Sequence, residues 1–170
     1  MEVSQEFGAS GVPVINFGKY IVDGWMPHSR ISAAGHVRVQ IDCVAAGLPL
    51  TGFVKCLQVT TTLSKNTLAA GDMVMLMHQI EGWRIARLGF GRQAPSRWRS
   101  VSGCWPSKSA RYSGAVRNGG SRSYPFEFNI DVTYKWEYKS IVVPGDVTGT
   151  WARDTAAGMQ VCIESASAPD

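Results

Sequence analysis

The chain has few of the residues that catalytic and metal sites need. Its three histidines, at positions 28, 36 and 78, are isolated from one another. It contains no G-x-S-x-G, H-E-x-x-H or P-loop motif, the patterns that place a nucleophile, a zinc ion or a phosphate. Carboxylates that could pair for glycoside hydrolysis stand beside turn signals, where acidic residues are ordinary. We therefore predict that the protein is not an enzyme.

Cysteine is also scarce. The chain has no C-x-x-C, no histidine at ligand spacing, and only four widely separated cysteines: Cys43, Cys56, Cys104 and Cys162. These spacings disfavour a zinc site, so free thiols are the default, although the even number would also permit disulfides in more than one pairing. We predict no cofactor. A structural calcium ion held by loop carboxylates stays open, but no ordered ligand spacing supports it.

Long hydrophobic runs are missing. No window approaches the roughly 18 apolar residues of a membrane-spanning helix, and the start MEVSQEFGAS lacks the parts of a signal peptide. We expect no membrane insertion. With 170 residues, 45% of them hydrophobic, the chain is long enough to bury one core. We predict a single domain over residues 1–170.

Acidic residues are absent from position 82 to position 126, a segment that holds nine of the 17 Lys and Arg residues. Such a segment attracts phosphate or carboxylate groups, on nucleic acid or on an anionic surface polysaccharide. Alternating strands could equally turn these side chains to different faces, so that no patch forms. We predict that nucleic acid is the less favoured partner.

What the chain does have is alternation and turn signals. The segment TYKWEYK, residues 133–139, alternates aromatic and charged side chains, which predicts a strand with its rings on one face. The β-branched run at 141–143 is followed by Pro144-Gly145, which predicts a strand end. Asn118-Gly119 between two alternating segments predicts a hairpin.

Similar patterns predict further strands at residues 12–17, 36–44, 53–62, 72–80, 112–116, 124–130 and 159–163. The methionines of residues 72–80 would also suit a helix. Residues 26–32 are predicted to be turn-like, residues 83–90 to be a strand or a short helix, and residues 93–111 to be a loop. Many short strands joined by turns indicate an all-β fold, and we predict an antiparallel β-sandwich of the jelly-roll type.

Aromatic residues are plentiful, with six tryptophans and five tyrosines. They fit a sugar-binding surface, because an aromatic ring stacks on the apolar face of a pyranose. Trp98, Trp105 and Trp151 lie in or next to predicted loops, so we expect them to be exposed, whereas Trp136 is assigned to the core. With Arg117, the three loop tryptophans are the candidate ligand-binding residues. Simple packing explains them as readily, since tryptophan is highly buried on average.

Five segments in order carry a resemblance: MEVSQE, KYIVDGW, AAGDMVMLMHQIEGWRIARLGFG, YSGAVRNGGSRSYPFEFNI and WEYKSIVVPGDVTGTW. Together, over most of residues 1–160, they resemble a module of tail-fibre and other virion-associated proteins of phages and prophages, often of soil α-proteobacteria. The resemblance implies a carbohydrate-binding-module-like β-sandwich in a non-enzymatic attachment protein. It implies a place in the virion, or in the cytoplasm of the producing bacterium before assembly. It adds no site residue.

The chain departs from that module in two places. Residues 92–111 stand where the family has an apolar, aromatic strand, and the last residues replace a longer continuation. We therefore expect a domain that is truncated or diverged at 92–111 and 162–170. A missing strand would leave a sheet edge open to another subunit.

The leading hypothesis is a virion-associated, tail-fibre-like protein that binds host-surface polysaccharide without catalysis. We expect it to contact other virion subunits and to form a homo-oligomer, which would raise weak affinity to useful avidity. The alternative is a capsid-decorating or fibre-building protein without a glycan site. A binder needs exposed rings beside hydrogen-bonding groups, whereas a structural protein shows apolar patches that fit a partner.

Overall fold

The structure is a computed structural model that describes residues 12–13, 20, 24–29, 35–42, 55–63, 67, 69, 72–120 and 122–164. The chain divides into two compact units, residues 1–76 with 168–170, and residues 77–167. The prediction of a single domain over residues 1–170 stays a prediction. The part of the predicted strand at 12–17 that follows residue 13 lies outside the described residues.

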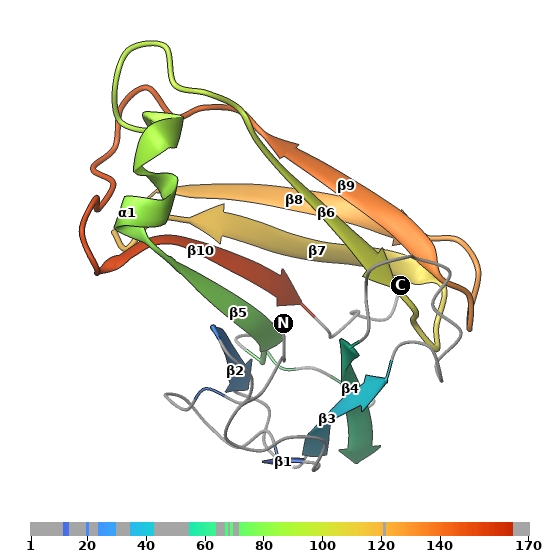
Figure 1. The fold of residues 1–170 in the computed structure, drawn as a ribbon. Helices are drawn as coiled ribbons and strands as arrows, with labels where there is room; N and C mark the ends of the chain where they lie inside the picture. Colours follow the sequence, from blue (N-terminus) through green and yellow to red (C-terminus); the bar gives the residue numbers. More distant parts are fainter. Residues whose placement is uncertain are drawn as a thin grey trace. The chain divides into compact units, whose positions relative to one another are not determined.

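The first unit holds a three-stranded sheet with the order β1-β3-β4 (Figure 1). Its strands are Val12–Pro13 (β1), Gly35–Asp42 (β3) and Lys55–Leu63 (β4). The central strand β3 is antiparallel to both neighbours. This confirms the strands predicted around residues 36–44 and 53–62.

The largest sheet has five strands in the order β2-β5-β10-β7-β8. They are Trp25–Ser29 (β2), Val74–Glu81 (β5), Ala157–Glu164 (β10), Ala110–Arg117 (β7) and Ser123–Ile130 (β8). Strand β7 is antiparallel to β10 and β8, which confirms the hairpin at Asn118-Gly119. Residues 72–80 are confirmed as a strand rather than a helix. The turn predicted at 26–32 is wrong for residues 26–29, which belong to β2, and residues 30–32 lie outside the described residues. Pro27 is tolerated because β2 is an end strand of the sheet.

A two-stranded ribbon of Trp98–Cys104 (β6) and Glu137–Val143 (β9) runs beside strands β7 and β8 in Figure 1. Inward side chains of the ribbon and of the larger sheet share one hydrophobic core with residues of the connecting segments. The buried members are Ile85, Phe90, Val116, Phe126, Val143, Trp151, Met159 and Val161. Among the described residues these two antiparallel sheets and one short helix make a sandwich-like arrangement, so the fold is mostly β.

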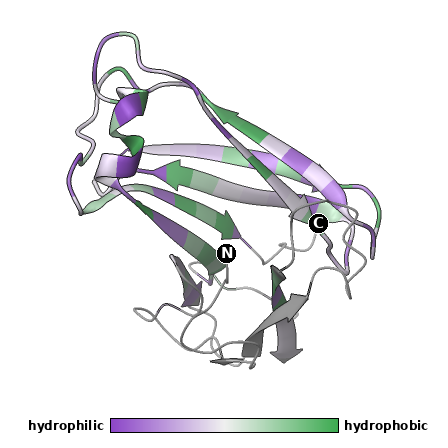
Figure 2. Ribbon diagram, in the orientation of Figure 1, coloured by the Kyte–Doolittle hydropathy of each residue, from purple (hydrophilic) through white to green (hydrophobic). Residues whose placement is uncertain are grey.

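Figure 2 shows how hydropathy follows this packing. Strand β10 lies between β5 and β7 and is largely hydrophobic, and four of its eight residues are buried. Strand β9 alternates instead, with partly or fully buried residues at every second position. A strand with neighbours on both sides and cover on its faces needs continuous apolar character, whereas a half-exposed strand needs only alternation.

The predicted loop at residues 93–111 is wrong. All seven residues of β6 pair with β9, from Trp98 opposite Val143 to Cys104 opposite Glu137. Serine and glycine make this segment resemble a loop in composition, but its pairing partner lies some forty residues further along the chain. A strand is therefore present within residues 92–111, and residues 162–164 belong to β10.

The aromatic strand predicted at residues 133–139 is wrong for residues 133–136 and right from Glu137 onward. Residues 131–136 form a turn and a connection, and the strand begins only at Glu137. Within β9 the charged side chains face inward: Glu137 and Lys139 are 13% and 16% exposed, and their charged groups lie 2.6 Å apart. Tyr138 points outward and is 56% exposed. Pairing of the two charges offsets the cost of their partial burial, which alternation alone does not reveal.

For residues 83–90 the prediction left a strand or a short helix open, and residues 83–88 are helical. The helix Gly82–Ile85 (α1) continues into the 3₁₀ turn Ala86–Leu88 (η1). The amide of Gly82 donates to the carbonyl oxygen of Ala156 at 2.8 Å. A Cβ atom at Gly158 would collide with the backbone of Gly82, so two glycines allow the helix backbone to touch strand β10 directly.

Three of the four cysteines, Cys56, Cys104 and Cys162, are free thiols, in agreement with the default expectation. Cys43 lies outside the described residues. Within the described ranges, no helix combines the length and the apolar character required to cross a bilayer.

Gly114→Ala tests the packing of the larger sheet. A Cβ atom there would collide with the carbonyl oxygen of Cys162 and lie 2.5 Å from the Phe126 ring. Because such overpacking typically costs about 1–3 kcal/mol, we expect a fall of that order in the free energy of unfolding, measured by urea denaturation. Gly120→Ala is the control, since its nearest neighbour would be 3.5 Å away, an ordinary van der Waals distance. Equal stability of the two variants would contradict this packing.

Candidate functional site

The structure does not bring the four predicted site residues together. Trp98 begins strand β6 and Trp105 follows its last residue, so these two rings lie at opposite ends of the ribbon. Arg117 ends strand β7 with an exposed side chain. Trp151 lies in the connection between β9 and β10. Their ligand-binding roles stay predictions.

Of the three tryptophans predicted to be exposed, only Trp105 is exposed. Trp105 is 43% exposed, as expected, but Trp151 is 9% exposed. The Trp151 ring meets Phe90 edge-on at 4.8 Å between ring centroids, and this packing is what buries it. Trp98 is half-buried and packs against the core. Trp136, assigned to the core from sequence, is half-buried beside Trp105, with ring centroids 6.5 Å apart.

An exposed aromatic cluster lies at the end of β6. The rings of Trp105 and Tyr134 meet edge-on, with centroids 5.6 Å apart, and Tyr134 is 64% exposed. Trp136 also lies beside Trp105, with its ring tilted by 38°. We call Trp105, Tyr134 and Trp136 the aromatic platform. Sequence reasoning found Trp105 but missed Tyr134, because it placed that residue in a strand.

The backbone of Tyr134 is held in an unusual conformation. Its φ of 53° is in the left-handed region, which costs a non-glycine residue on the order of 1 kcal/mol or more. The amide of Tyr134 donates to the carbonyl oxygen of Pro106 at 2.9 Å. Nearby, the Glu137 carboxylate accepts the amides of Asp131 and Val132 at 3.0 and 2.7 Å. These bonds fix the turn and turn the Tyr134 ring toward solvent beside Trp105.

Polar side chains accompany the platform. In the sequence, Ser107 and Lys108 come two and three residues after Trp105, and Lys135 lies between Tyr134 and Trp136. All three side chains are exposed. They add exposed hydroxyl and ammonium groups close to the platform in sequence. This combination suits a ligand with one apolar face and several hydroxyl groups.

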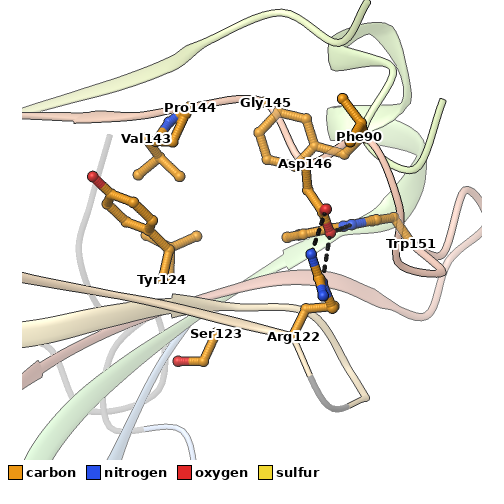
Figure 3. A pocket seen from close by; sticks show the side chains of 11 residues that line it. Phe90, Arg122, Ser123, Tyr124, Val143, Pro144, Gly145, Asp146 and Trp151 are labelled. Carbon is orange, nitrogen blue, oxygen red and sulfur yellow. Dashed lines mark hydrogen bonds and ion pairs between the residues drawn. The ribbon is translucent and has the colours of Figure 1, made fainter. Parts of the chain in front are cut away.

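A second constellation lies at the other end of the ribbon, around Asp146 (Figure 3). Arg122 donates to both oxygens of this carboxylate, from Nε at 3.0 Å and from Nη2 at 2.8 Å. Trp151 Nε1 donates at 3.0 Å, and Thr148 donates through its amide at 3.0 Å and its hydroxyl at 3.2 Å. The Arg122 guanidinium, helped by the Thr148 amide and the Trp151 indole, holds the pKa of the Asp146 carboxyl well below its usual range.

The β7–β8 hairpin positions Arg122 for this pairing. Asn118 is buried, and its side-chain oxygen accepts the amides of Gly120 at 2.9 Å and Arg122 at 3.0 Å. Its side-chain nitrogen donates to the carbonyl oxygen of Thr150 at 2.8 Å. One asparagine therefore shapes the hairpin and attaches it to the segment that carries Asp146 and Trp151.

A pocket of about 470 Å³ opens beside this network. In Figure 3, Tyr124 and Val143 lie on one side of it, and Arg122, Asp146 and Trp151 lie on the other. The full lining is Phe90, Val116, Arg122, Ser123, Tyr124, Val143, Pro144, Gly145, Asp146, Val147 and Trp151. Of the predicted site residues, only Trp151 contributes to it.

The residues that the structure describes contain no group of three or more His, Cys, Asp or Glu side chains placed to hold a metal ion. No protein-family model, no curated protein and no solved structure matches the chain. The resemblance to virion modules therefore stays a prediction, as does the absence of enzymatic activity.

Acid titration tests the Asp146 network. Because the folded pKa of Asp146 lies below its ordinary value of 3.8, its contribution to stability is complete above that value and is lost as the pH falls below it. We expect the difference in unfolding free energy between the wild type and Asp146→Asn to be largest near pH 6 and to shrink toward pH 2.5, measured by urea denaturation at each pH.

Glu127→Gln is the matched control, since Glu127 pairs with Arg111 at the surface, where both side chains are more than half exposed. Exposed ion pairs contribute little, so this variant should follow the wild-type curve. A constant gap between wild type and Asp146→Asn from pH 6 to pH 2.5 would show that the carboxylate is not stabilised by folding.

Proposed function

We propose that the chain is a phage or prophage virion-associated, tail-fibre-like protein that binds host-surface glycan without catalysis, as a single jelly-roll β-sandwich. The observation that carries this proposal is the aromatic platform, where Trp105 and Tyr134 expose 43% and 64% of their surface while in contact with each other. Monomeric proteins usually bury rings of this size. Two exposed rings in contact therefore favour a binding role over simple packing.

The geometry of the platform suits a sugar ring. The planes of Trp105 and Tyr134 lie at 65° to each other, so one ring can stack on a pyranose while the other borders its edge. Ser107, Lys108 and Lys135 supply polar groups at the same place. Stacking contributes affinity, and the polar groups select which hydroxyls are accepted.

The distribution of positive charge favours a polysaccharide over nucleic acid. Arg84 and Arg87 lie on the helical turn, whereas Arg99 lies on β6. Arg111 and Arg117 stand near opposite ends of β7, about 20 Å apart at the usual rise per residue. Charges spread in this way do not form one continuous stripe along a phosphate backbone.

Location and assembly complete the proposal. The protein resides in the virion, or in the cytoplasm of the producing bacterium before assembly, and contacts other virion subunits there. A homo-oligomer presents several platforms to one polysaccharide, so that weak individual contacts add to a useful avidity.

Trp105→Ala tests the proposed function. On an array of bacterial surface polysaccharides, we expect saturable binding by the wild type and a loss of at least about tenfold in affinity for Trp105→Ala, because stacking is removed. Trp83→Ala is the matched control, since Trp83 is 57% exposed but lies on α1, away from the platform. Equal loss in both variants, or binding by neither variant nor wild type, would contradict a glycan site at the platform.

One observation favours the structural alternative, a capsid-decorating or fibre-building protein. The outward face of the ribbon carries three exposed apolar or aromatic side chains, Val101 at 49%, Val142 at 47% and Tyr138 at 56%. The strand register places all three on the same face, because Val101 stands opposite Ser140, Val142 opposite Arg99, and Tyr138 opposite Gly103. An apolar face of this kind fits a partner subunit.

Sedimentation of a double variant tests this alternative. If the outward face of the ribbon joins subunits, Val101→Lys with Val142→Lys should reduce the oligomer to smaller species in analytical ultracentrifugation, because buried ammonium groups are costly. Val132→Lys is the control, since Val132 is also 47% exposed but precedes β9. An unchanged sedimentation profile for the double variant would exclude this face as the subunit contact.

A further inference from the structure

The pocket beside Asp146 lies far from the aromatic platform. It includes Val143, which ends β9 and pairs with Trp98, whereas the platform begins after Cys104 at the other end of β6. Seven paired residues separate the two places, or about 20 Å at the usual rise per residue. A ligand in this pocket would therefore occupy a second site.

The charged groups that face the pocket are unequal in what they can offer a ligand. Asp146 already accepts five hydrogen bonds, from Arg122, Thr148 and Trp151. A carboxylate has about four acceptor positions, so Asp146 has none left for a ligand. Its side chain is 14% exposed, against 49% for Arg122. Arg122 is therefore the more accessible of the two charged residues that line the pocket.

Arg122 keeps donors in reserve. Its Nε and Nη2 are used by Asp146, and Nη1 has no partner among the residues that the structure describes. The bidentate pair fixes the plane of the guanidinium, so Nη1 is held in place without further loss of entropy. Nη1 can donate to an acceptor on a ligand, and a negatively charged acceptor gains most from it.

The opposite wall is apolar and aromatic. Tyr124 is 39% exposed, and its hydroxyl has no hydrogen-bond partner within the described part of the chain. Val143 lies next to it in Figure 3, with Pro144 and Val147 also in the lining. This wall offers a ring face and aliphatic carbons to the apolar side of a ligand, and the phenol offers one hydrogen bond at the rim.

We propose that this pocket binds a carboxylate-bearing pyranose, that is, a uronic-acid unit of an acidic polysaccharide. The sugar ring stacks against Tyr124, and the carboxylate accepts hydrogen bonds from Arg122 Nη1. The volume of about 470 Å³ lies within the usual range for small-ligand pockets. The proposal deepens the glycan-binding function and rests on it, and it assigns the acidic sugar to the pocket rather than to the platform.

Titration with single sugars, followed by nuclear magnetic resonance, tests the proposal on the full chain. The indole N–H of Trp151 reports on the pocket and that of Trp105 on the platform. We expect D-glucuronate to shift the Trp151 indole signal in a saturable way and to leave the Trp105 signal in place. D-glucose lacks the carboxylate and acetate lacks the ring. Each should bind with an affinity at least about tenfold lower, measured from the titration of the Trp151 signal.

Tyr124→Ala is the informative variant, because Tyr124 lines the pocket but takes no part in the Asp146 network. It should weaken glucuronate binding at least about tenfold while the Trp151 indole signal of the free protein keeps its folded position. Trp105→Ala is the control and should bind glucuronate as the wild type does. Unchanged binding by Tyr124→Ala would overturn the proposal.

The outcomes separate this proposal from the wider one. A Trp151 signal that glucuronate leaves unmoved, in a protein that still binds polysaccharide through Trp105, overturns the pocket proposal alone. Acetate acting as strongly as glucuronate would reduce the pocket to a plain carboxylate site and overturn the sugar assignment. If glucuronate moves the Trp151 signal but Trp105→Ala binds polysaccharide like the wild type, the pocket proposal is supported and the platform proposal is contradicted.

Discussion

The hydrogen bonds of the Asp146 carboxylate hold together the end of the sandwich-like unit that surrounds the pocket. Its bonds join the β7–β8 hairpin, through Arg122, to the connection between β9 and β10, through Trp151. The amide of Gly91 also donates to the Asp146 carbonyl oxygen at 2.7 Å, which attaches the segment after α1. Three connections that are distant in sequence are thus fixed at one residue. Without that junction the pocket would lose its shape.

This junction also shows what two segments of the sequence contribute to the fold. YSGAVRNGGSRSYPFEFNI contains Asn118 and Arg122, and WEYKSIVVPGDVTGTW contains Asp146 and Trp151. In the structure these residues bond to one another or to neighbouring backbone, so the segments describe how the fold is closed. Of the platform residues, Trp136 begins the second segment, whereas Trp105 and Tyr134 lie outside both. The same two segments also supply Arg122 and Tyr124 of the pocket.

The sequence predicted what depends on local signals. Asn118-Gly119 predicted its hairpin, Pro144 the end of β9, and alternation or apolar runs most strands. It failed where long-range contacts decide. Strand β6 exists because β9 pairs with it. Glu137 and Lys139 face inward because they pair with each other. Trp151 is buried because its ring packs against Phe90 and its indole N–H donates to Asp146. Trp105 was found because exposed loop aromatics carry a local signal, whereas Tyr134 required the turn geometry of residues 131–136.

The contact between Gly82 and Gly158 has a dynamic consequence. Helix α1 is too short to be stable by itself, and its first amides donate to the carbonyl oxygens of Ala156 and Asp154, just before β10. With no side chain between the two backbones, the helix cannot slide or lift without breaking the register of the strand beside it. Helix α1 and strand β10 therefore open together as one cooperative unit. We therefore expect this turn of helix to stay closed for as long as the strand does.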